Sequence, residues 1–433
     1  MKQQHIRFSI AAALAAMCAP AAHAVDVTAG DWKLSFDGNV NADYIYSNCE
    51  SLDSAKNIGG GLTCVAPNDG QRSSSSVSNG LLPAALSISA ATTQAGYDIG
   101  VTFGLYPGIS TNNGGSPNLQ GVGAAGGGAV ATNTALGTAG LDVRQVFLTF
   151  GNKEMGTVLA GRNIGLFGAD AILNDMTLLG VGANGSNAAP TNTSLGSIGY
   201  GYIYTDWLAQ INYTTPDLNG VKVTIGIFDP LESLTDGTGP TPKATPGFHG
   251  KVAYKTDGPL YLSASFIYEK QEFQRSDALG NLITGQKVSY DGTGFDFGGK
   301  YDLPMGFQVA AWGYYAKGLG TTGLFIRSAD TDPASPGYGE NRKSYGALAQ
   351  VTYKIPDTNY KLGVNYGTSR LSLADKEVNP TLVKLNDKVS LGVYDQLTPN
   401  LMLLAEGTTM WSKNQVGDEN KAWVANVGAF VSF

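Results

Sequence analysis

The last residues of the chain, Trp423-Val424-Ala425-Asn426-Val427-Gly428-Ala429-Phe430-Val431-Ser432-Phe433, indicate the fold class. Every second residue from Trp423 to Phe433 is apolar, whereas the residues between them include Asn426 and Ser432. Successive side chains of a strand point to opposite faces, and a tilted strand needs about ten residues to cross a bilayer. This stretch therefore predicts a transmembrane β-strand with one face toward lipid and the other toward an interior. The same alternation recurs along most of the chain.

The amino-terminus has the features of a secretory signal. Lys2 and Arg7 precede an apolar run over 8–22, and Ala22 and Ala24 supply the small residues that a signal peptidase recognises. We expect residues 1–24 to be the signal and residues 25–433 to form a single barrel domain. The apolar run is too short for a membrane-spanning helix, and no later segment is long and apolar enough, so a helical membrane protein is excluded.

Charge and motifs argue against several classes of partner. Loss of the signal removes two cations and lowers the formal charge from −7 to −9, and the sequence has no basic cluster of the kind that nucleic acid requires. The stretch 180–185 matches a dinucleotide-binding fingerprint, with Asp206 at a suitable distance, but no helix is expected after it, so we predict no cofactor. Asp330 and Asp332 could bridge surface polyanions through a divalent ion, although a solvated acidic loop is the simpler interpretation.

The cysteines suggest one disulfide. Cys49 and Cys64 lie in a Gly- and Ser-rich segment of an exported chain, where a bond between them would close a surface loop. Two free thiols are the alternative. Cys18 raises a lipoprotein alternative, but Met17 is a poor residue before a lipidated cysteine.

Alternation predicts sixteen strands in an all-β, antiparallel transmembrane barrel. They are expected near 32–46, 82–92, 97–106, 142–150, 157–163, 201–214, 220–229, 248–255, 259–269, 289–301, 306–317, 343–354, 359–370, 386–396, 400–411 and 422–433. Short links rich in turn residues alternate with long polar links. An even strand number with short turns at one end and long loops at the other is typical of an outer-membrane barrel.

Aromatic and apolar side chains are placed as a membrane requires. Alternate positions over 221–227 and 260–268 are apolar, and the residues between them include Lys222 and Ser263. Tyrosines lie near the strand ends, where they would form interfacial girdles.

A barrel of this size has an aqueous lumen unless something fills it. The third long loop, at about 164–199, is the available segment, and its apolar spacing over 165–179 predicts a short helix against the wall. Asp170 and Asn174 would share one face of this helix, with Asp175 beside it. We expect Asp170 and Asp175 to form the acidic side of a constriction, with helix capping or solvent exposure as the alternative.

The basic side of the constriction would come from inward positions on the wall. Arg144 is the first candidate because its strand ends next to the strand that leads into the loop. The other candidates are Lys222, Lys251, Lys361 and Lys388. Acids and bases on opposite sides of a pore create a transverse field that favours polar, hydrated solutes.

Two hairpins resemble a known family. The stretches 144–150 (RQVFLTF) and 156–163 (GTVLAGRN) look like the strand pair before the constriction loop of Gram-negative trimeric general porins, and 211–220 (INYTTPDLNG) resembles the hairpin after it. With the signal, the terminal Phe433 and the strand number, the likeness spans the mature chain.

This resemblance implies a homotrimer of sixteen-stranded pores in the outer membrane. Small hydrophilic solutes and ions would diffuse passively through each pore, with a weak preference for cations. Arg144 would belong to the basic cluster of the wall, and Arg162 would face either the pore wall or the subunit interface. Phe433 would act as the carboxy-terminal signal for the barrel-assembly machinery, and lipid and lipopolysaccharide would surround the barrel. The second strand carries no basic residue over 84–92, unlike the family, so strong anion selectivity is not expected.

Other functions stay open. A channel dedicated to a sugar or an organic acid could use inward aromatics such as Trp312 and Tyr314, if the register of their strand places them inside. A barrel enzyme would need catalytic groups, but His249 is the only histidine after the signal and has no neighbouring nucleophile motif. An adhesive barrel could use the Gly/Ala-rich loop over 112–140 as a binding surface.

Overall fold

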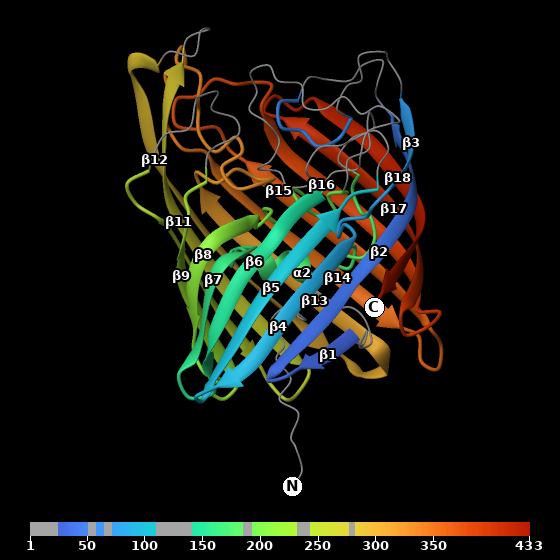
Figure 1. Ribbon diagram of the computed structural model, residues 1–433. Coiled ribbons are helices and arrows are strands. Elements are labelled where there is room, and N and C mark those ends of the chain that lie inside the picture. The colour runs from blue at the N-terminus through green and yellow to red at the C-terminus, as the bar shows by residue number, and fades with distance from the viewer. Residues whose placement is uncertain are drawn as a thin grey trace, which may run out of the picture.

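The computed structural model describes residues 25–50, 58–64, 72–109, 141–184, 193–231, 243–276 and 282–433, and these form one closed antiparallel barrel (Figure 1). Sixteen strands make up the wall. They are β2 (Trp32–Cys49), β4 (Ala85–Gln94), β5 (Tyr97–Pro107), β6 (Leu141–Asn152), β7 (Gly156–Ile164), β8 (Trp207–Thr214), β9 (Val221–Phe228), β10 (Gly247–Lys255), β11 (Leu260–Ser276), β12 (Leu282–Asp302), β13 (Phe307–Lys317), β14 (Lys343–Lys354), β15 (Tyr360–Leu371), β16 (Val383–Asp395), β17 (Leu401–Asn414) and β18 (Glu419–Ser432).

Pairing between the last and first wall strands closes the barrel. The ladder between β18 and β2 runs from the pair Ala422 and Cys49 to the pair Ser432 and Asn39, and β4 continues the wall on the other edge of β2. Two short strands complete the ladders of β2: β1 (Val25–Ala29) pairs with its beginning and β3 (Ser73–Ser78) with its end. Within the described residues, closure gives every wall strand a pairing partner on both edges, as lipid requires because it cannot satisfy free backbone groups.

Each predicted strand overlaps one wall strand, so the predicted barrel is confirmed. The predicted start of β8 at residue 201 was wrong. Asp206 has a left-handed backbone with φ of 60°, which interrupts a strand, and Tyr200 and Tyr202 are buried in the loop before it. The additional strands β1 and β3 were missed because they are short, and β3 (SSSSVS) has almost no apolar alternation.

The hairpin of β11 and β12 is longer than predicted and rises above the neighbouring strands in Figure 1. A short 3-10 turn, η3 (Pro304–Gly306), links β12 to β13 at the opposite end of the barrel. This short link and the tall hairpin thus lie at opposite ends of the barrel, and the predicted sorting of all the links stays a prediction.

The two faces of the wall differ as the alternation predicts. Phe295 is 64% exposed on the outer face of β12, whereas its neighbour Asp296 is 8% exposed on the inner face. Leu391 and Ser390 show the same contrast on β16, with 60% and 0% exposed. An exposed apolar outer surface is stable in lipid, because the hydrocarbon core does not penalise it as water would.

Among the described residues, no helix has both the length and the apolar character needed to cross a membrane. The predicted signal over 1–24, including Cys18, lies outside the described residues, as does the loop over 112–140.

Candidate pore constriction

Residues 165–184 and 193–206, the described part of the segment between β7 and β8, fold into the barrel and carry the single helical turn α2 (Ala169–Leu173) (Figure 1). We call this segment the inner loop. The helix is shorter than the predicted 165–179, and it begins after Gly168, whose φ of 76° suits glycine. All five residues of α2 are buried. The inner loop therefore packs against the wall and does not hang free in the lumen.

Asp170, the first predicted acid, is 4% exposed and faces the wall. Its Oδ1 lies 3.1 Å from Lys251 Nζ on β10, and its Oδ2 accepts a hydrogen bond of 2.9 Å from the Tyr261 hydroxyl on β11. Nearby, the Gly168 N–H donates to Asp296 Oδ2 over 2.6 Å. These contacts tie the beginning of α2 to three adjacent strands.

Asp175, the second predicted acid, is 3% exposed and also has several hydrogen-bond donors. Its Oδ1 accepts from the Thr177 N–H at 3.0 Å and from Asn365 Nδ2 of β15 at 3.2 Å. Its Oδ2 accepts from the Tyr202 hydroxyl at 2.9 Å. The predicted pairing of Asp170 and Asp175 on one side of the pore thus corresponds to two buried attachment points of the inner loop.

Further wall residues that sequence reasoning missed hold the middle of the inner loop. Gln350 on β14 donates to the Asn174 carbonyl at 2.7 Å and accepts from the Met176 N–H at 2.9 Å. The Tyr394 hydroxyl on β16 lies 3.0 Å from the Met176 carbonyl. Alternation could identify these inward positions, but no local signal reveals which segment they contact.

Glu406 on β17 is bound by the glycine-rich part of the inner loop. Its Oε2 accepts from the N–H groups of Val181 and Gly182, each at 2.8 Å, and its Oε1 lies 2.7 Å from the Tyr394 hydroxyl. A Cβ atom at Gly180 would come 2.2 Å from Glu406 Oε1, so any other residue here would force the Glu406 side chain to move. Residues 180–182 of the stretch that resembles a dinucleotide fingerprint therefore contact a carboxylate of the wall.

Arg144 lies on the inner face of β6 and is 5% exposed. Its Nε donates to Asp142 at 2.9 Å, and its guanidinium lies 5.0 Å from the Tyr106 ring and 5.8 Å from the Trp207 ring. Asp142, its partner two residues away on the same face, was not among the predicted site residues. A period of two along the strand could have identified it.

The four predicted wall lysines have different surroundings. Lys251 is paired with Asp170, and Lys388 is completely buried, with its Nζ 3.1 Å from Ser390 Oγ. Lys361 Nζ lies 4.9 Å from the centre of the Tyr394 ring. Lys222 is exposed on β9.

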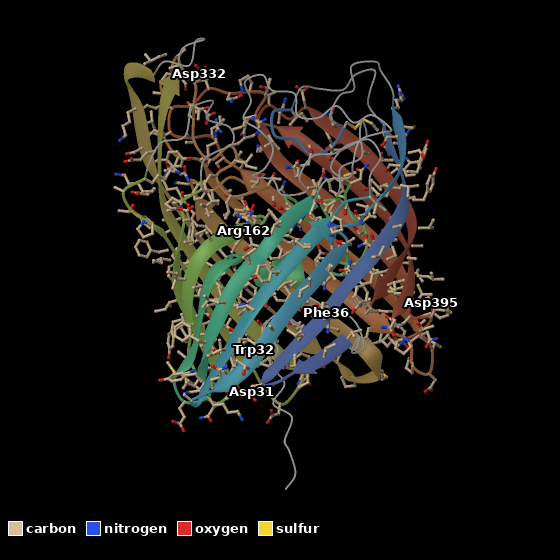
Figure 2. The ribbon with its side chains drawn as sticks, in the orientation of Figure 1. Asp31, Trp32, Phe36, Arg162, Asp332 and Asp395 are labelled. Atoms are coloured by element: carbon tan, nitrogen blue, oxygen red, sulfur yellow. A yellow bond between two sulfur atoms is a disulfide. The ribbon has the colours of Figure 1, made fainter. Side chains whose placement is uncertain are left out.

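Arg162 lies on the outside of the wall (Figure 2). It pairs in register with Val146, which is 39% exposed, whereas the next position pairs with the buried Phe147. Among the described residues, the Arg162 side chain has no ion pair or hydrogen bond.

The aromatic residues Trp312 and Tyr314 point inward from β13 but are 3% and 6% exposed. Trp312 packs in the same apolar cluster as Ile172 of α2. His249 is also buried, with Nε2 2.9 Å from Asn212 Oδ1 and its ring 5.0 Å from Phe228.

Two cavities flank the inner loop. The larger, of about 370 Å³, lies between 173–179 and the ends of β12 to β17 near the short turns, and Lys300, Lys354 and Lys361 are its basic lining residues. The smaller, of about 60 Å³, lies beside Arg144. Leu173, the last residue of α2, lines both cavities. We call them the lysine cavity and the arginine cavity.

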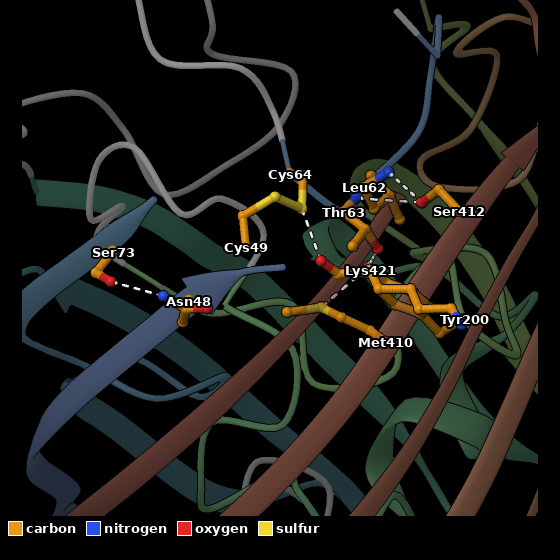
Figure 3. Close-up of a disulfide and its surroundings, with 10 residues drawn as sticks. All are labelled: Asn48, Cys49, Leu62, Thr63, Cys64, Ser73, Tyr200, Met410, Ser412 and Lys421. Carbon is orange, nitrogen blue, oxygen red and sulfur yellow. Dashed lines mark hydrogen bonds between the residues drawn. A yellow bond between two sulfur atoms is a disulfide. The ribbon is translucent and has the colours of Figure 1, made fainter. Parts of the chain in front are cut away.

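The predicted bond between Cys49 and Cys64 is present near the long-loop end of β2 (Figure 3). It holds the segment 58–64 against the inner loop and the wall. Thr63 Oγ1 lies 3.1 Å from the Tyr200 hydroxyl, which itself lies 3.3 Å from Met410 Sδ, and Leu62 N–H donates to Ser412 Oγ at 3.1 Å. The disulfide therefore stabilises the packing of the segment 58–64 on the inner loop at Tyr200.

A closed sixteen-stranded wall with a long loop packed inside defines the class of outer-membrane barrel channels. The chain belongs to the Gram-negative porin family, whose model matches residues 11–415. It is a protein of the Gram-negative outer membrane. The comparison with curated protein sequences finds no match.

Several solved structures share the fold. The outer-membrane channel DcaP of Acinetobacter baumannii has a TM-score of 0.63 and 14% identity, with 94% of this chain and 99% of that chain covered. The anion-selective porin from Comamonas acidovorans has a TM-score of 0.58 and 13% identity, with coverage of 93% and 100%. OmpF of Salmonella typhi, in a complex with daunomycin, has a TM-score of 0.55 and 14% identity, with coverage of 94% and 100%.

Proposed function

We propose that this porin lets small hydrophilic solutes and ions cross the outer membrane by passive diffusion along a water-filled path beside the inner loop. The lysine cavity is the observation that carries this proposal. It lies inside the wall, it has polar lining residues such as Gln308, Gln350 and Thr352, and it adjoins the short-turn end of the barrel. Polar side chains around a cavity within a low-dielectric wall favour the entry of hydrated solutes.

The conductance of the refolded, signal-free protein in a planar lipid bilayer tests this proposal. We expect stepwise increases in current in potassium chloride, since an aqueous path conducts both ions. A bilayer that stays silent after verified insertion would contradict passive diffusion and indicate a filled lumen.

The weak preference for cations stays a prediction. It rests on Asp170 and Asp175, whose carboxylates accept hydrogen bonds from Lys251, Tyr261, Tyr202 and Asn365. In contrast, three lysines line the larger cavity. A reversal potential measured across a potassium chloride gradient distinguishes the two signs of selectivity, and a sign that favours chloride would contradict the sequence-based prediction.

A channel dedicated to a sugar or an organic acid remains the second candidate. Burial of Trp312 and Tyr314 removes support from a sugar-stacking track along β13. The lysines of the larger cavity instead favour an acid as the solute.

The proposal also covers the oligomeric state of the chain and its partners in the membrane. One of the similar structures is described as the trimer form of OmpT of Vibrio cholerae, with a TM-score of 0.52, and the outward Arg162 supports a homotrimer for this chain. Lipid, lipopolysaccharide and the barrel-assembly machinery are the remaining proposed partners, with Phe433 as the assembly signal. Family and fold favour a channel and not an enzyme, so the buried His249 is proposed as a packing residue.

A further inference from the structure

The lysine cavity has two chemically different sides. Lys300, Lys354 and Lys361 supply positive charge from β12, β14 and β15. Leu173, Met176, Leu179 and Met402 supply apolar surface from the inner loop and β17. A cavity of about 370 Å³ falls in the range of sites that bind small organic molecules. The combination fits a solute that is charged at one end and apolar at the other.

The charge balance of this cavity favours anions. Lys300 Nζ donates to Asn174 Oδ1 at 2.8 Å, and Lys354 Nζ donates to the Thr358 carbonyl at 2.6 Å, so the partners of both are neutral. Among the described residues, neither forms an ion pair. Two carboxylates also line the cavity. Asp175 accepts hydrogen bonds through both oxygens, and Asp302 Oδ1 accepts one from Gln308 at 2.6 Å.

The arginine cavity, on the other side of Leu173, has a volume of about 60 Å³ and is too small for such a solute. Among the described residues that line it, Arg144 is the charged one, and the lining is otherwise mostly apolar, with Leu81, Ile172, Leu178 and Trp207 among its residues. One Arg144 nitrogen is engaged by Asp142, and the aromatic rings of Tyr106 and Trp207 flank the guanidinium. Because Arg144 already forms an ion pair and its cavity is small, the lysine cavity is the candidate site for a solute.

We infer that the lysine cavity is a binding site for organic anions with an apolar body, such as single-ring aromatic monocarboxylates. The carboxylate would contact the lysines through charge-assisted hydrogen bonds, and the ring would contact the leucines and methionines. Leu173 would supply part of the apolar side that contacts the ring. This inference deepens the proposed function, because it names a solute class for the same path.

Block of potassium chloride current in a planar bilayer tests the inference. Benzoate carries both features, acetate carries the charge without the ring, and benzamide carries the ring without the charge. We expect benzoate to reduce the current at about fivefold lower concentration than acetate, and benzamide to have little effect, because only benzoate uses both sides of the cavity.

Matched variants assign the effect to the cavity. The double substitution Lys300→Gln/Lys354→Gln should weaken the benzoate block about fivefold, whereas Lys317→Gln, at an exposed outward position of β13, should not change it. Leu173→Asn keeps the side-chain size and all charges, and it should also weaken the block. Amide exchange at residues 174–176 that matches the wild type in both variants would show that the loop is not displaced, either by loss of the bond between Lys300 and Asn174 or by the buried amide at position 173.

The outcomes separate the two proposals. Absence of potassium chloride current in the wild-type protein would overturn passive diffusion itself. A normal current that benzoate and acetate block equally, or that benzamide blocks as well as benzoate, would overturn only the inference. An unchanged benzoate block in both the double lysine variant and Leu173→Asn would also overturn it.

Discussion

At the scale of single residues, carboxylates decide where the inner loop lies. Asp170 and Asp175 belong to the loop, whereas Asp296 and Glu406 belong to the wall, and all four accept hydrogen bonds across the boundary between loop and wall. A buried charged acceptor with several donors holds its partners more strongly than a neutral one. The polar inner face that a porin presents to water is used here to bind its own loop.

Substitution of Glu406 by alanine tests this role. The N–H groups of Val181 and Gly182 would lose their acceptor, and each bond to a charged group contributes about 1.5–3 kcal/mol, so the inner loop should become mobile. We expect noisier single-channel currents and faster amide exchange at residues 181 and 182. Glu154→Ala, in an exposed turn between β6 and β7, is the control and should behave as wild type. Unaltered exchange in Glu406→Ala would show that Glu406 does not hold the loop.

At the scale of elements, two long loops support each other above the barrel. Arg342, just before β14, binds Glu377, between β15 and β16, through Nε at 2.9 Å and Nη2 at 2.6 Å. The Ala374 N–H also donates to Glu377 at 2.8 Å. Burial of the Glu377 carboxylate opposes its ionisation, but these donors outweigh it and hold the pKa of Glu377 below its ordinary value of 4.5.

This lowered pKa predicts that the loop between β15 and β16 becomes less stable in acid. A carboxyl whose pKa is lower in the folded state stabilises the fold above the unfolded pKa, and that stabilisation is lost as pH falls through the folded pKa. We expect residues 372–382 to lose amide protection below about pH 4.5. Exchange rates at pH 6 and pH 3, corrected for intrinsic rates, measure this.

Glu377→Gln should lower protection at pH 6 about tenfold and abolish the additional loss at pH 3, because one charge-assisted pair is missing at both values. Glu340→Gln, an exposed position of the other loop, provides the control. Equal protection of the wild-type loop at both pH values would contradict the role of this pair.

At the scale of the whole molecule, strand β7 places the charge of Arg162 on the outer surface of the barrel, where lipid alone would not favour it. An arginine on the lipid face of a barrel costs about 2–4 kcal/mol near the bilayer centre. Arg162 is such a residue, with the exposed Val146 as its register partner. A second copy of the chain over β6 and β7 would remove this cost by covering the guanidinium.

The oligomeric state therefore should depend on Arg162. We expect the wild-type protein to run as a trimer on unheated gels and in native mass spectrometry, and Arg162→Ala to dissociate at a lower temperature. Lys343→Ala, at an exposed outward position of β14, should dissociate as the wild type does. A monomeric wild-type protein, or the same dissociation temperature for Arg162→Ala, would contradict an interface at this face.

The sequence by itself determined the wall, because alternation is a local property that each strand displays in its own residues. It placed Arg144 inward and paired Cys49 with Cys64, since a period of two and an exported loop are both visible along the chain. It could not show that Asp170 and Asp175 are buried, because their partners Tyr261 and Asn365 are far away in the chain. Only the tertiary structure decides which inward residues meet the inner loop and which meet water. The physical reason is that the strand register selects a face, whereas the position of a long loop depends on all the wall strands that it contacts together.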